Sequence, residues 1–222
     1  MLERLRRYRD LARFLYAQRV IGFDAPERPH MDEPSYVAFQ SYLKTASFYL
    51  EFGSGGSTVE ASRHGIKTVC VESDRFYARI VRTKIGKDHD TVILDAKIGE
   101  TEAWGMPIQK RRTPARVKKW MNYTRIPFDY IAGTGLFPDF VLIDGRFRTA
   151  CALETARQAF MRGKYPKLMF DDYQDRPYYH MVEEFLGSPQ MIGRSALFDL
   201  AVGPKLAAIT PEIVAAAHSD LD

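Results

Sequence analysis

The sequence lacks the marks of several protein classes. Two cysteines occur in 222 residues, Cys70 in an apolar run and Cys151 in a predicted helix, which excludes a disulfide framework and a cysteine metal site. No run approaches the roughly 20 consecutive apolar residues of a membrane span. The arginine-rich start MLERLRRYRD also lacks the apolar segment of a secretory signal. We therefore expect a cytoplasmic protein that makes no membrane contact.

A strong net charge and internal repeats are also absent. The chain carries 32 Lys and Arg against 28 Asp and Glu, and a net charge of +4 is too small to indicate nucleic acid. The 45% of hydrophobic residues is typical of a globular protein and excludes a disordered or fibrous chain. We expect one domain over residues 47–210, an N-terminal helical extension over residues 1–46 and a C-terminal tail over residues 211–222.

Residues 2–19 have the pattern of an amphipathic helix. Apolar residues recur at three- and four-residue spacing, with arginines on the other faces, until Pro26, Pro29 and Pro34 break the chain. This pattern favours a solvent-exposed helix that lies on the domain, or the arm of a homodimer. Contact with RNA or with a membrane surface is the alternative.

After residue 47 the chain alternates strand and helix patterns. Strands are predicted near residues 48–50, 67–72, 91–95, 140–143 and 168–170, and helices near 35–44, 75–85, 150–163 and 175–187. The short apolar runs without polar alternation are typical of parallel strands covered on both faces. The fold class is therefore α/β, an open, doubly wound, mostly parallel sheet. Residues 100–137 interrupt the pattern as an aromatic and basic insert that we expect to cover a site.

The segment YLEFGSGGSTVEAS is the most informative part of the sequence. An apolar strand ends at Glu51 and enters a turn with three glycines, which let the backbone approach a ligand closely. Thr58 stands where a dinucleotide fingerprint beginning at Gly53 requires glycine or alanine. This position disfavours a nicotinamide oxidoreductase, which stays open as an alternative.

This turn resembles the first motif of class I S-adenosylmethionine-dependent methyltransferases, with Glu51, Gly53, Gly55 and Ser57 at the matching positions. The resemblance implies a seven-stranded Rossmann-like sheet whose last strands form a hairpin near residues 193–209. It also implies S-adenosylmethionine as cofactor. The next predicted strand ends at Glu72, which can accept both ribose hydroxyls, and the third ends at Asp95, which meets the adenine amino group in that family. The candidate cofactor-binding residues are Glu51, Gly53, Ser54, Gly55, Ser57, Glu72, Ser73, Asp95 and Ala96.

Two later strands end in aspartate, in PDFVLIDGRFR and KLMFDDY. Parallel strands would bring Asp144, Asp171 and Asp172 to one edge of the sheet. They match the cation ligands of metal-dependent O-methyltransferases of the macrocin O-methyltransferase type, which implies Mg²⁺. The alternative is that Arg146, Arg148 or Arg176 balances the carboxylates, so the metal is left open.

The sequence departs from that group after Asp144, where Arg146, Phe147 and Arg148 replace its histidine. Asp144 and Arg146 are the candidate catalytic residues. The five histidines show no ligand spacing, and His180 is the weak candidate for a base.

We expect methyl transfer to an oxygen of a small-molecule acceptor, catalysed chiefly by alignment of the reactants. The first rival is a catalytically inactive cofactor-binding or interaction protein. An RNA methyltransferase is a variant that the basic insert motivates, although nucleic acid is not the expected partner.

Overall fold

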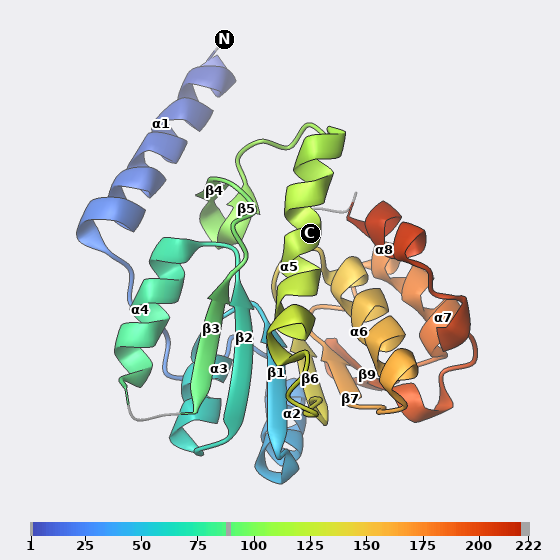
Figure 1. The fold of residues 1–222 in the computed structure, drawn as a ribbon. Coiled ribbons are helices and arrows are strands. Elements are labelled where there is room, and N and C mark those ends of the chain that lie inside the picture. Colours follow the sequence, from blue (N-terminus) through green and yellow to red (C-terminus); the bar gives the residue numbers. More distant parts are fainter. Residues whose placement is uncertain (1, 88–89, 219–222) are drawn as a thin grey trace.

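The computed structural model describes residues 2–87 and 90–218, and for Leu2, Glu3, Arg4 and Arg7 it describes the backbone alone. A seven-stranded sheet in the order β3-β2-β1-β6-β7-β9-β8 forms its centre (Figure 1). The first five of these strands are parallel and β9 runs antiparallel between β7 and β8. This is the doubly wound α/β sheet that the sequence predicts. The strands are β1 (Phe48–Phe52), β2 (Lys67–Glu72), β3 (Thr91–Asp95), β6 (Phe140–Ile143), β7 (Lys167–Phe170), β8 (Gln190–Ile192) and β9 (Ser195–Asp199).

Helices cover both faces of the sheet because successive strand residues alternate between them. Leu50 and Phe52 of β1 pack toward α5 and α6, whereas Tyr49 packs toward Phe39 and Leu43 of α2. The helices are α1 (Leu2–Tyr16), α2 (Glu33–Thr45), α3 (Gly56–Arg63), α4 (Arg75–Ile85), α5 (Pro114–Ile131), α6 (Arg148–Arg162), α7 (Glu183–Leu186) and α8 (Pro211–Ala217), with a 3-10 helix before α7 (Pro177–Val182). None of the described helices is long and apolar enough to span a membrane.

Residues 100–137 differ from the expected covering insert. A small hairpin of β4 (Thr101–Glu102) and β5 (Met106–Pro107), joined by a 3-10 turn (Ala103–Gly105), is followed by α5, the crossover helix from β3 to β6. Trp120, Tyr123 and Phe128 recur at helical spacing and are buried in the core, so they do not form an aromatic surface. Trp104, in the hairpin, is 85% exposed.

The C-terminal part also differs in detail. The predicted hairpin turns at Gly193, but its second strand ends at Asp199, and residues 200–208 form two short 3-10 helices, Leu200–Val202 and Leu206–Ala208. Residues 211–217, expected in the tail, form α8, because Thr210 caps its N-terminus and Val214 and Ala217 are buried against the core. The rest of the expected tail, residues 219–222, lies outside the described residues.

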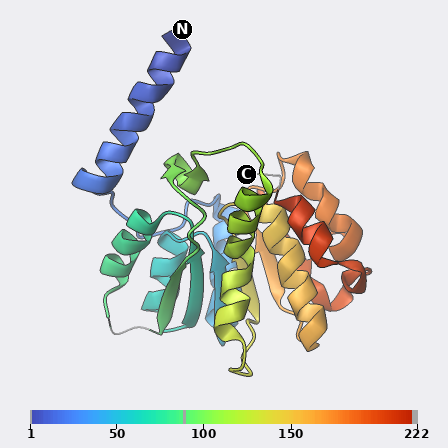
Figure 2. The ribbon, with the colours of Figure 1, turned by 45° about the horizontal axis from the view of Figure 1, so that its top comes forward.

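The N-terminal extension has two parts. Helix α1 points away from the domain (Figure 2) and continues into a π-helical turn, Ala17–Ile21, that contacts α4. Residues 22–32, the linker, then cross the first turn of α3 to reach α2. A side chain at Gly56 would collide with the backbone of Arg28, so the linker lies directly on the glycine turn.

Candidate functional site

The glycine turn connects β1 to α3 at the carboxyl edge of the sheet. Gly53 has a φ of +102°, and a Cβ at this position would lie 2.7 Å from the Cα of Gly145, which follows β6. Gly145 has no room for a side chain either, because the hydroxyl of Tyr123 fills that space. Two strand ends are therefore packed backbone to backbone. At Gly55, by contrast, the nearest atom to an added Cβ is the Tyr77 hydroxyl at 3.8 Å, so the turn is open there.

Glu51 lies beneath the turn and has no exposed surface. Its carboxyl group accepts hydrogen bonds from the hydroxyls of Ser57 and Thr58, and Thr58 in turn accepts one from the backbone N–H of Gly55. Burial raises the pKa of Glu51 to about 8, and the nearby Asp144 and Glu72 add to the shift while the two hydroxyls oppose it. In this structure Glu51 and Ser57 hold the shape of the turn from below.

Glu72, at the end of β2, is the acidic group that lies beside the upper side of the turn. One carboxylate oxygen accepts from the N–H (3.0 Å) and hydroxyl (2.7 Å) of Ser54, and the other accepts from the N–H groups of Ser73 and Asp74 (2.7 and 2.8 Å). Burial raises the pKa of Glu72, although these donors counteract the rise. Ser73 also donates to the carbonyl of Gly105, so the β4-β5 hairpin lies over this part of the edge.

Asp95 lies opposite Glu72 in the register of β2 and β3. Its side chain is partly exposed and accepts from the N–H of Lys97 at 3.1 Å. Ala96 is buried, and its backbone groups are already engaged: its N–H donates to the carbonyl of Glu72 and its carbonyl accepts from Asn122. Glu72, Ser73 and Asp95 are thus brought together, as the sequence predicts for a cofactor site.

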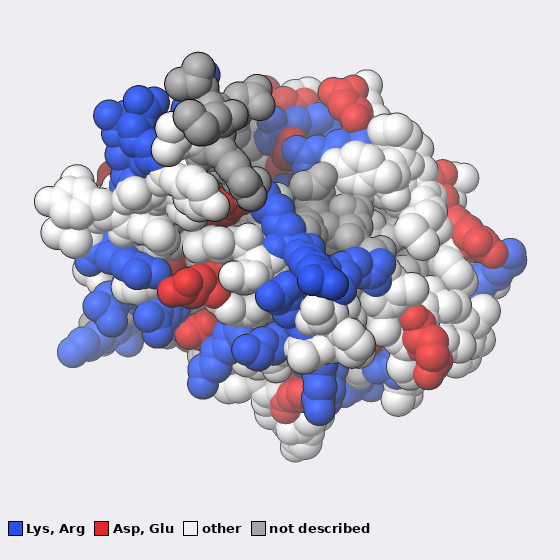
Figure 3. Space-filling view, turned by 90° about the horizontal axis from the view of Figure 1, so that it is seen from above, with Lys and Arg blue, Asp and Glu red and all other residues white. Residues whose placement is uncertain are grey.

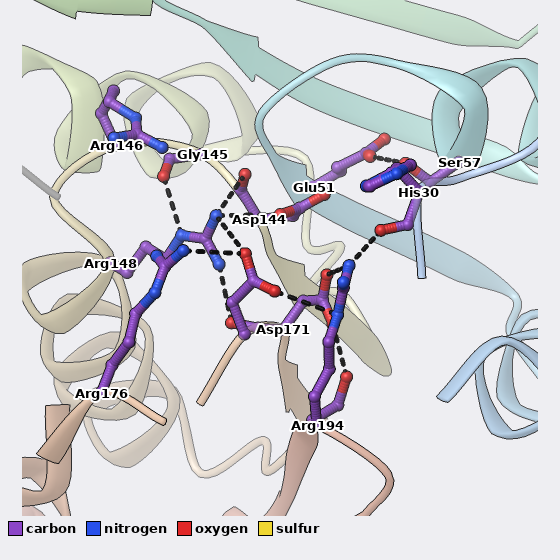
Figure 4. Close-up of polar contacts among 12 residues, drawn as sticks. His30, Glu51, Ser57, Asp144, Gly145, Arg146, Arg148, Asp171, Arg176 and Arg194 are labelled. Atoms are coloured by element: carbon purple, nitrogen blue, oxygen red, sulfur yellow. Dashed lines mark hydrogen bonds and ion pairs between the residues drawn. The ribbon is translucent and has the colours of Figure 1, made fainter. Parts of the chain in front are cut away.

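A second group of predicted residues meets farther along the same edge (Figure 4). Asp144, Asp171 and Asp172 each offer an oxygen, and these oxygens lie within 4.8 Å of one another. The three carboxylates form what we call the aspartate cluster. The prediction that β6 and β7 deliver them to one place is confirmed by this geometry.

Three arginines surround the aspartate cluster. Arg148, whose side chain is 4% exposed, lies 3.0 Å from Asp144 and 3.7 Å from Asp172. Arg176 pairs with Asp172 at 3.1 Å. Arg194 pairs with Asp171 at 3.2 Å and with Asp172 at 3.0 Å, and Ser195 donates to Asp171 at 2.6 Å. Burial raises the pKa of Asp144 to about 7, with Arg148 opposing the rise and the other two aspartates increasing it.

The three carboxylates of the aspartate cluster favour a metal ion, whereas the arginines around them disfavour one. Three clustered carboxylates are the ligands that Mg²⁺ prefers. In this arrangement, however, three guanidinium groups already balance the three negative charges, and Arg148 lies where a cation would be repelled. The cluster as it stands fits the arginine alternative rather than a divalent cation, and we derive no chemistry through one. The metal site remains an untested prediction.

Left-handed backbone at non-glycine residues marks this edge. Lys97, Phe147 and Asp172 follow β3, β6 and β7, and have φ values of 51°, 55° and 53°. Residues in this region cost free energy and persist where the surroundings fix them, which is common at functional sites. The segments after three strands of the same sheet edge, β3, β6 and β7, thus share a conformation that regular turns would avoid.

Several candidates lie apart from the aspartate cluster. The backbone N–H of Arg146 donates to Tyr123, but no ion pair joins its side chain to the cluster among the described residues; Arg148 takes that position instead. His180 is exposed and stacks on Tyr173. His218 is buried between Thr124 and Val214, and burial lowers its pKa to about 4.

The structure adds residues that the sequence did not single out for the site. Tyr123 bridges β2 and the segment after β6 through its hydroxyl, which donates to the carbonyl of Val71 and accepts from the N–H of Arg146. Arg194 and Ser195 come from the final hairpin, where Ala196 pairs with Phe170, the residue before Asp171. The predicted hairpin near residues 193–209 is the sequence signal that points to these two residues. Its antiparallel pairing with β7 places the start of β9 opposite the end of β7.

Comparison with solved structures gives an informative match. A crystal structure of a methyltransferase-like protein from Silicibacter pomeroyi DSS-3 is 34% identical in sequence, with a TM-score of 0.71. The similarity covers 88% of this chain and 100% of that one. No protein-family model and no curated protein matches this chain.

Proposed function

Since this chain belongs to the family of methyltransferase-like proteins, we propose that it transfers a methyl group from S-adenosylmethionine to an oxygen of a small-molecule acceptor. The observation that carries the proposal is the position of Glu72. Its carboxylate lies at the carboxyl edge of the sheet, 2.7 Å from the hydroxyl of Ser54 in the glycine turn. In such a sheet, ligands bind at this edge, and an acidic strand end next to a glycine turn suits a ribose with two hydroxyl donors.

The residues present fit this cofactor. When it is bound, S-adenosylmethionine supplies a methyl group activated by a positively charged sulfur. Glu72 would accept the ribose hydroxyls, which can replace the hydroxyls of Ser54 and Ser73 as its donors. The open face of Gly55 leaves room for the part of the ligand that crosses the turn. Asp95 would face the base and Asp144 the reacting end.

Asp144 is the residue best suited to take the acceptor's proton. Transfer of the methyl group to the acceptor oxygen would release the proton of that hydroxyl group, which needs a base. A carboxyl group with a pKa of about 7 is ionised in part of the molecules near neutral pH and can receive that proton. Arg148, 3.0 Å away, would orient the carboxylate and stabilise its charge.

The surface around the site favours an acceptor with negative charge. Figure 3 looks onto the carboxyl edge and shows Lys and Arg side chains gathered in a band across it. Exposed basic residues precede and begin α5, among them Arg111, Arg112, Lys118 and Lys119. Such a band raises the local concentration of anionic ligands.

Calorimetric titration with S-adenosylhomocysteine, the product form of the cofactor, tests the proposal. We expect saturable binding by the native protein and at least about tenfold weaker binding by Glu72→Gln, which keeps the size of the side chain but not its second acceptor oxygen. Glu184→Gln is the matched control, because Glu184 is an exposed residue paired with Lys205. We expect the same affinity in excess magnesium and in chelator, in line with the arginine pairing.

Each result separates the alternatives. No binding by the native protein would refute the cofactor assignment. Binding without methyl transfer to any of a set of hydroxylated small anions would favour the inactive cofactor-binding protein. A magnesium-dependent gain in affinity that Asp144→Asn abolishes would restore the metal site.

A further inference from the structure

A cavity of about 330 Å³ lies next to Glu72, on the side of β3. Its walls come from the residues that follow β2, from the loop after β3 and from the π-helical turn of the N-terminal extension. They include Gln18, Arg19, Ser73, Phe76, Asp95 and Lys97. This volume is in the range of small-ligand sites. A ribose held by Glu72 would place its base toward this cavity, since Glu72 and Asp95 are register partners.

Gln18 is the most unusual wall residue. Although polar, it is 4% exposed and comes from a segment outside the core of the domain. Its side-chain N–H donates to Asp74 and, at 3.5 Å, to Thr101. Asp74 is itself fixed, because its other oxygen caps α4 by accepting from Phe76 and Tyr77. The amide is therefore oriented, and its carbonyl oxygen has no hydrogen bond among the described residues.

The adenine that the family resemblance places beside Asp95 would lie in this cavity, and we propose that Gln18 is a specificity-determining residue for it. The inference rests on the proposed function and extends it to the N-terminal extension. Adenine carries an exocyclic amino group, a donor that needs acceptors. The carbonyl of Gln18 and the carboxylate of Asp95, of which one oxygen accepts from Lys97, supply them.

The aromatic and basic walls suit a flat base as well. The guanidinium groups of Arg19 and Arg75 lie over the Phe76 ring, 5.7 and 4.9 Å from its centre, and such planar groups can stack on a flat base. Arg19 is held in turn by Glu100 at 3.2 Å. Hypoxanthine, with a carbonyl in place of the amino group, would direct an acceptor at the acceptors of Gln18 and Asp95 and bind more weakly.

The test compares the binding of S-adenosylhomocysteine with that of S-inosylhomocysteine by calorimetry. We expect the native protein to prefer the adenine compound by about tenfold or more. In Gln18→Met the affinity for the adenine compound should fall about tenfold and the preference should shrink. Gln190→Met, the same change at an exposed residue of β8, is the control and should leave both affinities unchanged. Gln18→Met also removes a hydrogen-bond partner of Asp74, so Asp95→Asn provides a second variant that keeps this partner. The amide of asparagine can donate to hypoxanthine, so this variant should prefer adenine over hypoxanthine less strongly.

The outcomes separate this inference from the proposed function. If the native protein binds S-adenosylhomocysteine and Gln18→Met leaves the preference unchanged, Gln18 has no part in base recognition and the inference is wrong. If Glu72→Gln weakens binding at the same time, the proposed function stands without it. If the native protein binds neither compound, both fail.

Discussion

Glu51, at the start of the glycine turn, has no exposed surface, so its carboxyl group is fully buried. Its pKa is raised from 4.5 to about 8 by burial, so the folded protein keeps the proton over a pH range in which the unfolded chain releases it. The folded state binds more protons between these two values, and its stability therefore falls as pH rises from 4.5 to 8. The free energy of unfolding lost in this way reaches about 5 kcal/mol at high pH.

We therefore predict that Glu51→Gln becomes more stable relative to the native protein as pH rises. Glutamine matches the size of the protonated carboxyl group and retains partners in Ser57 and Thr58, but it has no proton to lose. Denaturant unfolding of both proteins at several pH values measures the difference. A difference that stays constant between about pH 5 and pH 8 would show that the buried carboxyl group titrates normally.

His218 makes the opposite prediction. Its imidazole is buried, and burial lowers its pKa from 6.5 to about 4, so the folded protein holds it neutral while the unfolded chain protonates it. The stability that the neutral, buried imidazole contributes is fully present above pH 6.5. It is lost as pH falls toward 4, which lowers the free energy of unfolding by up to about 3 kcal/mol. The variant His218→Gln should lack this loss. Comparing the free energy of unfolding of the two proteins at about pH 7.5 and about pH 4.5 tests it, and parallel pH profiles would contradict it.

At the scale of an element, neighbouring glycines of the same turn have different roles. A Cβ at Gly55 would make only an ordinary contact with the Tyr77 hydroxyl at 3.8 Å, whereas a Cβ at Gly56 would collide with the linker backbone at Arg28. We predict that Gly55→Ala keeps the melting temperature but weakens S-adenosylhomocysteine binding. Gly56→Ala should instead lower the melting temperature, even though alanine favours a helix by up to about 1 kcal/mol over glycine.

Calorimetry and thermal melts of the two variants distinguish these effects, and limited proteolysis reports on the linker. Gly56→Ala should expose residues 22–32 to cleavage, while Gly55→Ala should not. Equal melting temperatures for the two variants would show that the linker does not pack on the turn.

The elements themselves could be predicted because their signals are local. Helix α4 and strands β2 and β3 lie at the residues expected, since apolar runs and helical spacing are written along a continuous stretch of chain. The sequence pattern does not predict α5, because Pro127 and the basic residues obscure the helical spacing of Trp120, Tyr123 and Phe128. The helix accommodates this proline in its interior, so a crossover helix stands where the pattern predicts an insert.

The sequence predicts those residues of the candidate site that lie at the ends of strands. Glu72, Asp95, Asp144 and Asp171 each follow an apolar run, and parallel strands deliver such residues to one edge. Arg194 and Gln18 reach the edge from a hairpin and from a π-helical turn that are distant in sequence, and no local pattern fixes where such segments lie. The charge of the aspartate cluster depends in part on Arg194, so the sequence alone does not decide between a metal ion and arginine partners.

At the scale of the whole molecule, the N-terminal extension combines a projecting helix with a packed segment. The described side chains of residues 5–10 are exposed, whereas Gln18, Ala25 and Pro29 are buried against the domain. The ring of Phe14 stacks on Phe23 at 5.5 Å, which fixes the end of the helix to the linker. The extension predicted as residues 1–46 therefore packs against the domain from about Gln18 onward, and Gln18 and Arg19 line the cavity beside Glu72.

This division predicts different results for two truncations. Removal of residues 1–9 takes away exposed helix and should change the melting temperature by less than about 2 °C, with no effect on S-adenosylhomocysteine affinity. Removal of residues 1–22 also takes away Gln18 and Arg19 and exposes Asp74 and Phe76, so affinity should fall by at least about tenfold and the melting temperature should drop. Thermal melts and calorimetry on both chains measure this. Equal affinities of the two truncated chains would place the N-terminal extension outside the cofactor site. Unfolding of the chain that lacks residues 1–9 would show that α1 is part of the core.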